Sequence, residues 1–174
     1  MGVLMRIQNG DEQQLERLIE STYPKIYSYL LRRLRNSTIA KDFTQETFLR
    51  FMKHLSSLPS DTKIENYLYR IAYHLCMDYF RIYQREQEEI EVSSQDKLPI
   101  EVVLQKEKEI QIQEAIACLS DEQKDVILLR YYQDLKIKEI AYILNEKEST
   151  VKTRLRLGMK KLAAILERSD WREY

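Results

Sequence analysis

Glycine and proline are scarce in this sequence, with three of each among 174 residues. An all-β fold needs these residues at its many tight turns, so their scarcity argues against one. Leu, Ile, Glu, Lys, Arg and Gln are common instead, and these residue types favour helices. We therefore expect an all-α protein whose length suits one medium domain or two small ones.

Signals for secretion, membrane insertion and metal binding are also missing. The opening residues lack the apolar core of a signal peptide, and no segment approaches the roughly 18 consecutive apolar residues of a membrane span. The two cysteines and two histidines show neither C-x-x-C nor H-x-x-x-H spacing. We expect reduced thiols, a cytoplasmic protein without direct membrane insertion, and no metal or cofactor. Motifs with paired carboxylates, a Cys–His pair or a Gly-rich phosphate loop are absent too, so we expect no enzyme.

The net charge is zero, but the charges are unevenly distributed. Residues 1–85 hold 13 basic and 9 acidic residues, and residues 86–110 hold 3 basic and 8 acidic ones. The stretch from Ser149 to Lys161 carries five basic residues and no acid. An acidic segment between two more basic units therefore conceals local basic patches that could bind nucleic acid.

Hydrophobic periodicity predicts two small helical domains joined by an acidic flexible linker. The first domain spans residues 1–85, the linker residues 86–109 and the second domain residues 110–174. In the first domain we expect a helix that Pro24 breaks or bends, further helices over 43–55 and 64–82, and a loop at 56–61 between them. Within the linker, a short amphipathic piece at Val102–Leu104 could dock elsewhere.

The second domain shows the spacing of a C-terminal helix-turn-helix. Ser120 and Gln123 form a capping box, and the last two helices are expected over residues 136–144 and from about 148 to 166. Asn145 between them suits the left-handed conformation of a tight turn. Short hydroxyls and basic side chains then face outward, as contacts to base edges and phosphates require: Ser149, Thr150, Lys152, Thr153, Arg154, Arg156 and Lys160. The alternative is an amphipathic helix with a solvated basic face.

Aromatic and basic residues alternate between Tyr67 and Tyr83. Aromatic rings beside guanidinium groups can stack on unpaired bases and hold their phosphates. Core packing is the alternative for these aromatic residues, and Tyr79 in particular lies on the apolar stripe, where we expect it to serve the core.

Three motifs, in order, resemble those of the extracytoplasmic-function sigma factors of bacterial RNA polymerase. Asp42–Leu49 is similar to the family's "DxxQETF" helix. Tyr67–His74 with Asp78–Arg81 resembles its "WLYRIAxN…DxxR" helix. Leu119–Ser120, Val126–Tyr131, Ile140–Ala141 and Thr150–Leu155 resemble its C-terminal domain.

The resemblance implies an alternative sigma factor that binds core RNA polymerase and promoter DNA, both as duplex and as melted single strand. The residues expected to face polymerase are Asp42, Gln45, Glu46 and Arg50, for which a solvated helix flank is the alternative. Those expected at the melted minus-10 element are Leu58, Ser60, Asp61, Lys63, Tyr69, Arg70, Tyr73, His74 and Arg81. For His74, an ordinary surface or packed imidazole is the alternative. The helix-turn-helix would read the minus-35 duplex, and an anti-sigma factor is the expected inhibitory partner.

The sequence departs from the family pattern at five positions. Tyr67 stands where Trp is usual, and Leu58 where Phe is common. Glu146 and Lys147 occupy the helix-turn-helix turn, where an apolar residue and a capping Ser are expected. Gly158 lies inside the last helix, where it is expected to cost about 1 kcal/mol. These departures bear on promoter sequence more than on function.

Two other functions remain open from the residues alone. An autonomous helix-turn-helix repressor would dimerise and bind palindromic duplex DNA, but this leaves the first domain without a role. A helical adaptor would bind only proteins.

Overall fold

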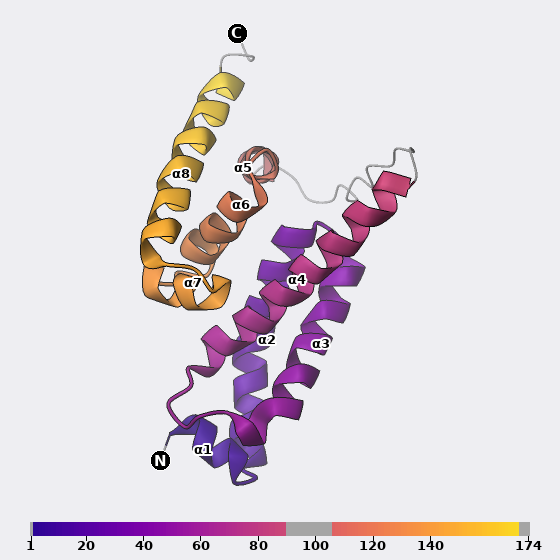
Figure 1. Cartoon of the computed structure of the whole chain (residues 1–174), viewed down its shortest axis with the longest axis vertical. Coiled ribbons are helices and arrows are strands. Elements are labelled where there is room, and N and C mark those ends of the chain that lie inside the picture. The colour runs from indigo at the N-terminus through magenta and orange to yellow at the C-terminus, as the bar shows by residue number, and fades with distance from the viewer. Residues whose placement is uncertain (1, 90–105, 171–174) are drawn as a thin grey trace. The chain divides into compact units, whose positions relative to one another are not determined.

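The computed structural model describes residues 2–89 and 106–170, and these residues form helices and connecting turns without any strand. Two compact helical units follow one another along the chain (Figure 1). The first contains helices α1 to α4, and the second contains α5 to α8. The expected fold class, an all-α chain of two small helical domains, is confirmed.

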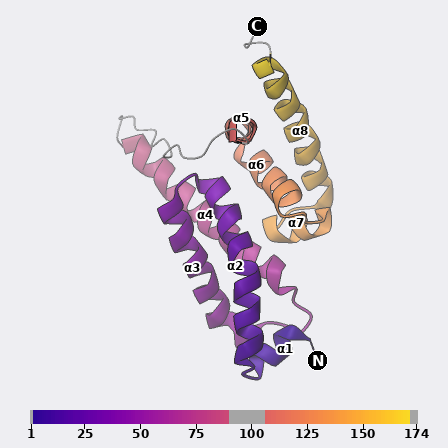
Figure 2. The same cartoon turned by 180° about the vertical axis from the view of Figure 1, so that it is seen from behind.

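The first unit is built on three long helices. A short helix α1 (Val3–Gln8) precedes α2 (Glu12–Leu34), α3 (Ser37–His54) and α4 (Ile64–Glu89), with a 3-10 turn η1 (Leu55–Ser57) after α3. The long helices lie side by side when seen from either side of the molecule (Figures 1 and 2). Side chains of Asp11 and Asn36 cap α2 and α3 by accepting from backbone amides three residues ahead.

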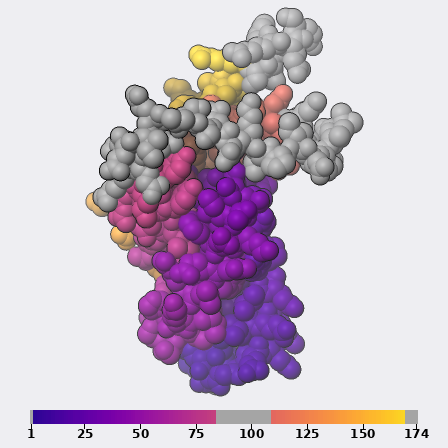
Figure 3. Space-filling view, turned by 90° about the vertical axis from the view of Figure 1, so that its right-hand side faces the viewer, coloured from indigo at the N-terminus to yellow at the C-terminus, as the bar shows by residue number. Residues whose placement is uncertain are grey.

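Large side chains fill the space between these three helices. Tyr29, Leu30, Phe51, Leu68 and Tyr69 are fully buried. The rings of Tyr29 and Tyr69 meet edge to face, with 5.8 Å between their centroids. In the space-filling view, the side chains of this unit pack into one continuous surface (Figure 3). The first unit therefore has a hydrophobic core of its own.

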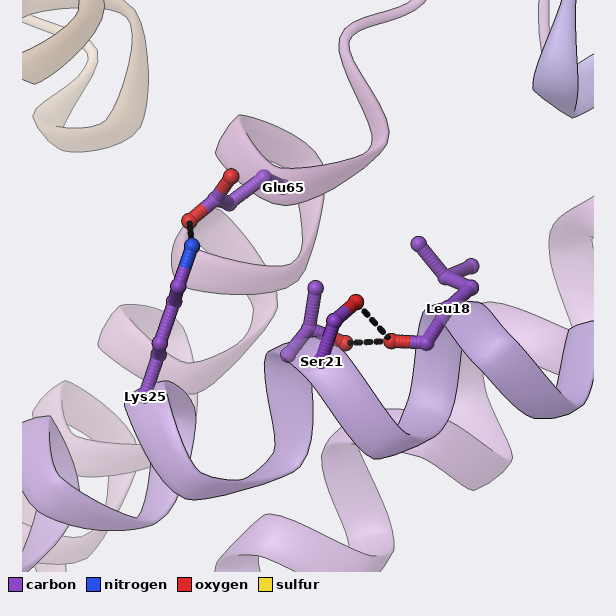
Figure 4. A network of polar contacts seen from close by, with 5 residues as sticks. Leu18, Ser21, Lys25 and Glu65 are labelled. Atoms are coloured by element: carbon purple, nitrogen blue, oxygen red, sulfur yellow. Dashed lines mark hydrogen bonds and ion pairs between the residues drawn. The ribbon is translucent and has the colours of Figure 1, made fainter.

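A break or a bend was expected at Pro24, and the break does not occur: α2 runs from Glu12 to Leu34 through Pro24 without interruption. Pro24 is exposed, so the carbonyl that lacks a donor one turn earlier can be hydrated. The hydroxyls of Ser21 and Thr22 both donate to the carbonyl of Leu18, at 3.0 and 2.6 Å. Figure 4 shows these bonds beside the ion pair of Lys25 with Glu65, 2.9 Å long, that ties α2 to α4. Burial of the flanking helix faces outweighs the proline penalty.

The helices extend into both ends of the expected linker. Residues 86–89 continue α4, and residues 106–109 begin α5 (Lys106–Ala117). Glu, Gln, Lys and Arg are good helix formers, so a charged stretch alone does not separate an exposed helix from a linker. The rest of the linker, including the amphipathic piece at 102–104, lies outside the described residues.

The second unit continues with α6 (Asp121–Ile127), a π-helical segment η2 (Leu128–Tyr132), α7 (Ile137–Leu144) and α8 (Glu148–Asp170). The predicted capping box is confirmed: Gln123 N donates to Ser120 Oγ, and Ser120 N donates to Gln123 Oε1. The guanidinium of Arg130, within η2, donates to the Leu135 carbonyl at 2.9 Å. This bond fixes the turn that leads from η2 to α7. The unit's core includes the fully buried Val126, Leu129, Ile140 and Val151.

Gly158 lies where α8 packs against α6. A Cβ at this position would come within 2.9 Å of Ile127 Cδ1 and 3.3 Å of Gln123 Cβ. The glycine expected to weaken the helix therefore permits a close contact between two helices.

Candidate nucleic-acid interface

The predicted polymerase-facing residues lie on the side of α3 opposite its core face. Asp42 and Gln45 are exposed, and Glu46 and Arg50 are partly exposed. Arg50 Nε donates to Glu46 Oε1 at 2.7 Å, one helical turn away. This hydrogen bond to Arg50 holds the pKa of the Glu46 carboxyl below its usual value.

Two apolar side chains that were not among the predicted site residues continue this surface. Leu49 is 55% exposed and Met52 is 41% exposed. Along α3, Asp42, Gln45, Leu49 and Met52 follow one another at intervals of three, four and three residues. This spacing places all four side chains on one side of the helix. This helical spacing from Asp42 and Gln45 is the feature of the sequence that could have identified Leu49 and Met52 as part of the same surface. The exposed side of α3 thus combines charged, amide and apolar groups, as protein–protein interfaces do.

The loop between α3 and α4 carries the first group of predicted minus-10 residues. Ser60, Asp61 and Lys63 are exposed, whereas Leu58 is half-buried at the start of the loop. Gln8 at the end of α1 donates from its Nε2 to the carbonyls of Leu55 and Leu58, at 2.9 Å each. No sequence pattern indicates a role for Gln8, because its partners lie about 50 residues away.

On α4, only some of the residues predicted to contact the minus-10 element are exposed. Arg70 and Tyr73 are partly exposed, and His74 and Arg81 are exposed. Tyr69 is fully buried against Tyr29, so its assignment to a DNA-contacting surface is corrected: in this structure Tyr69 is a core residue. It precedes the partly exposed Arg70 by one residue, a rotation of about 100° that turns its side chain toward α2.

The aromatic residues further along α4 also serve packing. Tyr79 contacts Phe43 of α3 edge to face, with 5.7 Å between ring centroids, and stacks against Tyr83. The guanidinium of Arg33, only 6% exposed, lies 4.4 Å from the centre of the Phe80 ring. The expectation that Tyr79 belongs to the core stripe agrees with its half-buried position between two helices.

Helix α8 exposes most of the residues predicted to read duplex DNA. Ser149, Lys152, Thr153, Arg156 and Lys160 are exposed. Thr150 and Arg154 are partly exposed, and the intervening Val151 is fully buried, as the helical period requires. Asn145 adopts the predicted left-handed conformation, with φ of 54°. The turn between α7 and α8 thus has helix-turn-helix geometry, with a basic outer face on the second helix.

An ion pair crosses this turn. Arg154 Nη2 lies 3.0 Å from Glu146 Oε1, so the departure at Glu146 supplies a partner for a predicted DNA-contacting arginine. The two residues are eight apart and lie in different elements, and no helical spacing rule connects them. From the sequence alone, Glu146 is therefore recognisable only as a departure from the family pattern.

Two other kinds of site are absent from residues 2–89 and 106–170. No cluster of three or more His, Cys, Asp and Glu side chains is arranged to hold a metal ion within those ranges. None of the described helices combines the length and apolar character of a membrane span.

These features define the class of the protein: an all-α chain in which one helical unit precedes a second unit that ends in a helix-turn-helix with a basic outer face. Comparison with known families identifies it further. The family description "Sigma-70 region 2" matches residues 18–86, and "Sigma-70, region 4" matches residues 109–162. The ECF RNA polymerase sigma factor SigW of Bacillus subtilis is 30% identical over 172 residues, which cover 91% of this chain and 92% of SigW.

A second relative in the same organism, RNA polymerase sigma factor YlaC, is 31% identical over 84% of this chain and 90% of its own. The chain belongs to the extracytoplasmic-function sigma factors of the sigma-70 family. Members of this family are initiation factors that act with RNA polymerase.

Solved structures share the fold. Sigma factor RpoE, in complex with the anti-sigma factor NepR from Bartonella quintana, matches with a TM-score of 0.75 and 17% identity over 89% of this chain and 98% of that one. CnrH, in complex with the cytosolic domain of CnrY, matches with a TM-score of 0.74 and 17% identity over 95% and 96% of the two chains. These likenesses support the two-unit helical fold.

Proposed function

We propose that this chain is an alternative sigma factor that directs core RNA polymerase to promoters with separate minus-10 and minus-35 elements. The observation that carries the proposal is that the chain exposes three kinds of surface. One is the mixed polar and apolar surface on α3, and the other two are candidates for nucleic-acid binding: the loop after α3 and the outer face of α8. A repressor that binds only duplex DNA would need just the last of these three surfaces.

In this proposal, the α3 surface binds polymerase. Asp42 and Gln45 supply exposed polar groups, and the Glu46–Arg50 pair presents a fixed arrangement of charges. Leu49 and Met52 add exposed apolar area that a partner would remove from water.

Capture of the melted minus-10 strand is assigned to the loop after α3 and to the exposed residues of α4. A base removed from the stack costs a few kcal/mol, which a shaped pocket and stacking must offset. The exposed loop residues Ser60, Asp61 and Lys63 would contact the displaced base, with Leu58 at the start of the loop. Arg70, Tyr73, His74 and Arg81 would follow the strand along α4.

Reading of the minus-35 duplex is assigned to α8. Ser149, Thr150 and Thr153 offer short hydroxyls for base edges or phosphates in the major groove. Lys152, Arg154, Arg156 and Lys160 would neutralise phosphates or contact guanine. Loss of one phosphate contact, as in Lys152→Ala, is expected to reduce the salt slope of duplex binding by about 1.

The central experiment is transcription by core RNA polymerase from the host, with and without this protein, on fragmented genomic DNA. We expect new start sites that share a two-part upstream element. They should vanish with Gln45→Ala/Glu46→Ala and persist with Gln13→Ala/Glu16→Ala, a matched pair exposed on α2. If no specific starts appear and core polymerase does not bind, the proposal fails. Stand-alone dimeric binding to palindromic duplex would then identify a repressor, and a lack of any DNA binding would identify an adaptor.

We also propose an inhibitory protein partner. Two sigma factors of the same fold were solved in complexes, one with an anti-sigma factor and one with the cytosolic domain of CnrY. The test is purification of this chain from its host under non-stress conditions. We expect a stoichiometric partner that competes with core polymerase, and recovery of the chain without one would contradict the proposal.

A further inference from the structure

Gln8 joins the N-terminal helix to the loop that we assign to base capture. Its Nε2 lies 2.9 Å from the carbonyl oxygen of Leu55 and 2.9 Å from that of Leu58. Both partners are acceptors, so only the NH₂ end of the Gln8 amide can satisfy them, and its two hydrogens match the two carbonyls. The side chain therefore bridges two points of the same turn.

The bridged turn lies at the root of the loop. Leu55 begins η1, and the backbone amide of Leu58 donates to the Leu55 carbonyl at 3.4 Å, near the limit of a hydrogen bond. The shorter bonds from Gln8 therefore reinforce a turn that its own backbone closes weakly. Beyond Leu58, a separate turn closes with Thr62 N donating to the Pro59 carbonyl at 3.0 Å. Gln8 contacts the first turn and leaves the exposed tip at 59–61 accessible.

Helix α1 is itself anchored, so it can hold the loop in place. Leu4 and Ile7 are buried, and α1 packs against α2. The amide of Gln8 is partly buried, which reduces competition from water for the two carbonyls.

We propose that Gln8 is a positioning residue that pre-shapes the root of the base-capturing loop, so that the tip meets the displaced minus-10 base in its binding conformation. This inference rests on the proposed function. Pre-organisation lowers the conformational entropy lost when the loop closes on its ligand. Gln8 itself need not touch DNA. Its effect belongs to promoter opening, whereas the polymerase surface on α3 and the duplex-reading face of α8 do not involve it.

The test compares full-length Gln8→Glu with wild type on a promoter identified in the transcription experiment. Glu is nearly isosteric with Gln but replaces the NH₂ donor with an acceptor facing two carbonyls. We expect a roughly tenfold slower appearance of permanganate-reactive thymines in the minus-10 element, with affinity for core polymerase unchanged within about twofold. Gln8→Met, which removes the donor without adding charge, should slow opening in the same direction. Gln8→Lys keeps a donor and should recover much of the rate.

Gln13→Glu is the matched control, because it makes the same substitution at an exposed position on α2 and should open DNA at the wild-type rate. Amide hydrogen exchange of α2 to α4 verifies that each variant is folded. If folded Gln8→Glu and Gln8→Met open the promoter as fast as wild type, the positioning role is wrong while the sigma assignment stands. An equal fall in affinity for core polymerase and in the rate of promoter opening would also contradict the positioning role. If wild type with core polymerase opens no promoter, the proposed function fails, and the inference fails with it.

Discussion

Replacement of Gly158 by alanine separates intrinsic helix propensity from packing in the second unit. In an exposed helix interior, Gly→Ala stabilises by about 1 kcal/mol. At position 158, however, the added Cβ would lie 2.9 Å from Ile127 Cδ1 and 3.3 Å from Gln123 Cβ. Ile127 is buried, and the Gln123 atom is fixed close to the backbone, so neither can simply swing away. Overpacking of this kind costs about 1–3 kcal/mol, so we expect a net destabilisation of about 1 kcal/mol.

Native-state amide hydrogen exchange in the full-length protein is the suitable assay, because it reports on α6 and α8 separately from the first unit. Gly158→Ala should speed exchange in α6 and α8 and leave α2 to α4 unchanged. A second background, Ile127→Val, removes the Cδ1 atom, so the cost of Gly158→Ala should be smaller there. Ala163→Gly, at an exposed position of α8, is the matched control and should cost about 1 kcal/mol through propensity alone. Slower exchange in α6 and α8 of Gly158→Ala would refute the packing argument.

Three further perturbations test other residues. Tyr69→Ala should lower the free energy of unfolding of the first unit by about 3–5 kcal/mol, because it leaves a cavity. His74→Ala on the exposed side of α4 should change it by less than about 0.5 kcal/mol. Similar values for the two variants in denaturant titrations would contradict a buried Tyr69 and an exposed His74. Glu146→Gln should release Arg154 for a phosphate and make the slope of log affinity for duplex DNA against log salt more negative by about 0.9, and an unchanged slope would argue against it. Hydrogen bonds from the backbone amide of Glu122 and from the Ser120 hydroxyl lower the pKa of the Glu122 carboxyl below 4.5. The ionised carboxylate therefore stabilises the folded state above pH 4.5, and this stabilisation is lost as the pH falls through the folded-state pKa. Glu122→Gln should weaken this acid dependence of hydrogen exchange in α6, and an unaltered pH profile would exclude the contribution.

Local rules predicted the elements that depend on neighbouring residues. The capping box at Ser120 and the left-handed turn at Asn145 require only residues within a few positions, and both are present. The alternation of buried Val151 with exposed Lys152 on α8 follows from the helical period. Patterns of this range are visible in a single sequence.

Features that depend on distant residues were not predicted. Pro24 lies inside a helix because packing on both sides of it outweighs the local penalty. The same motif that selected Arg70 as a minus-10 residue also selected Tyr69, and only the position of Tyr29 on another helix shows that Tyr69 faces inward. Gly158 was expected to weaken its helix, and the sequence does not show that Ile127 and Gln123 of another helix pack closely against it. Partners separated by 30 or more residues give no signal that composition or periodicity can detect.

The core of the first unit has a consequence for the timing of synthesis. Among the side chains of α1 to α4 that the structure describes, the buried apolar ones lie between Leu4 and Cys76, so the core that these helices form among themselves comes from the first half of the chain. At about 5–20 residues per second, a ribosome needs a further 5 to 20 seconds or so to finish the protein after Cys76. The surface on α3 can therefore form on a nascent chain before α8 has been translated.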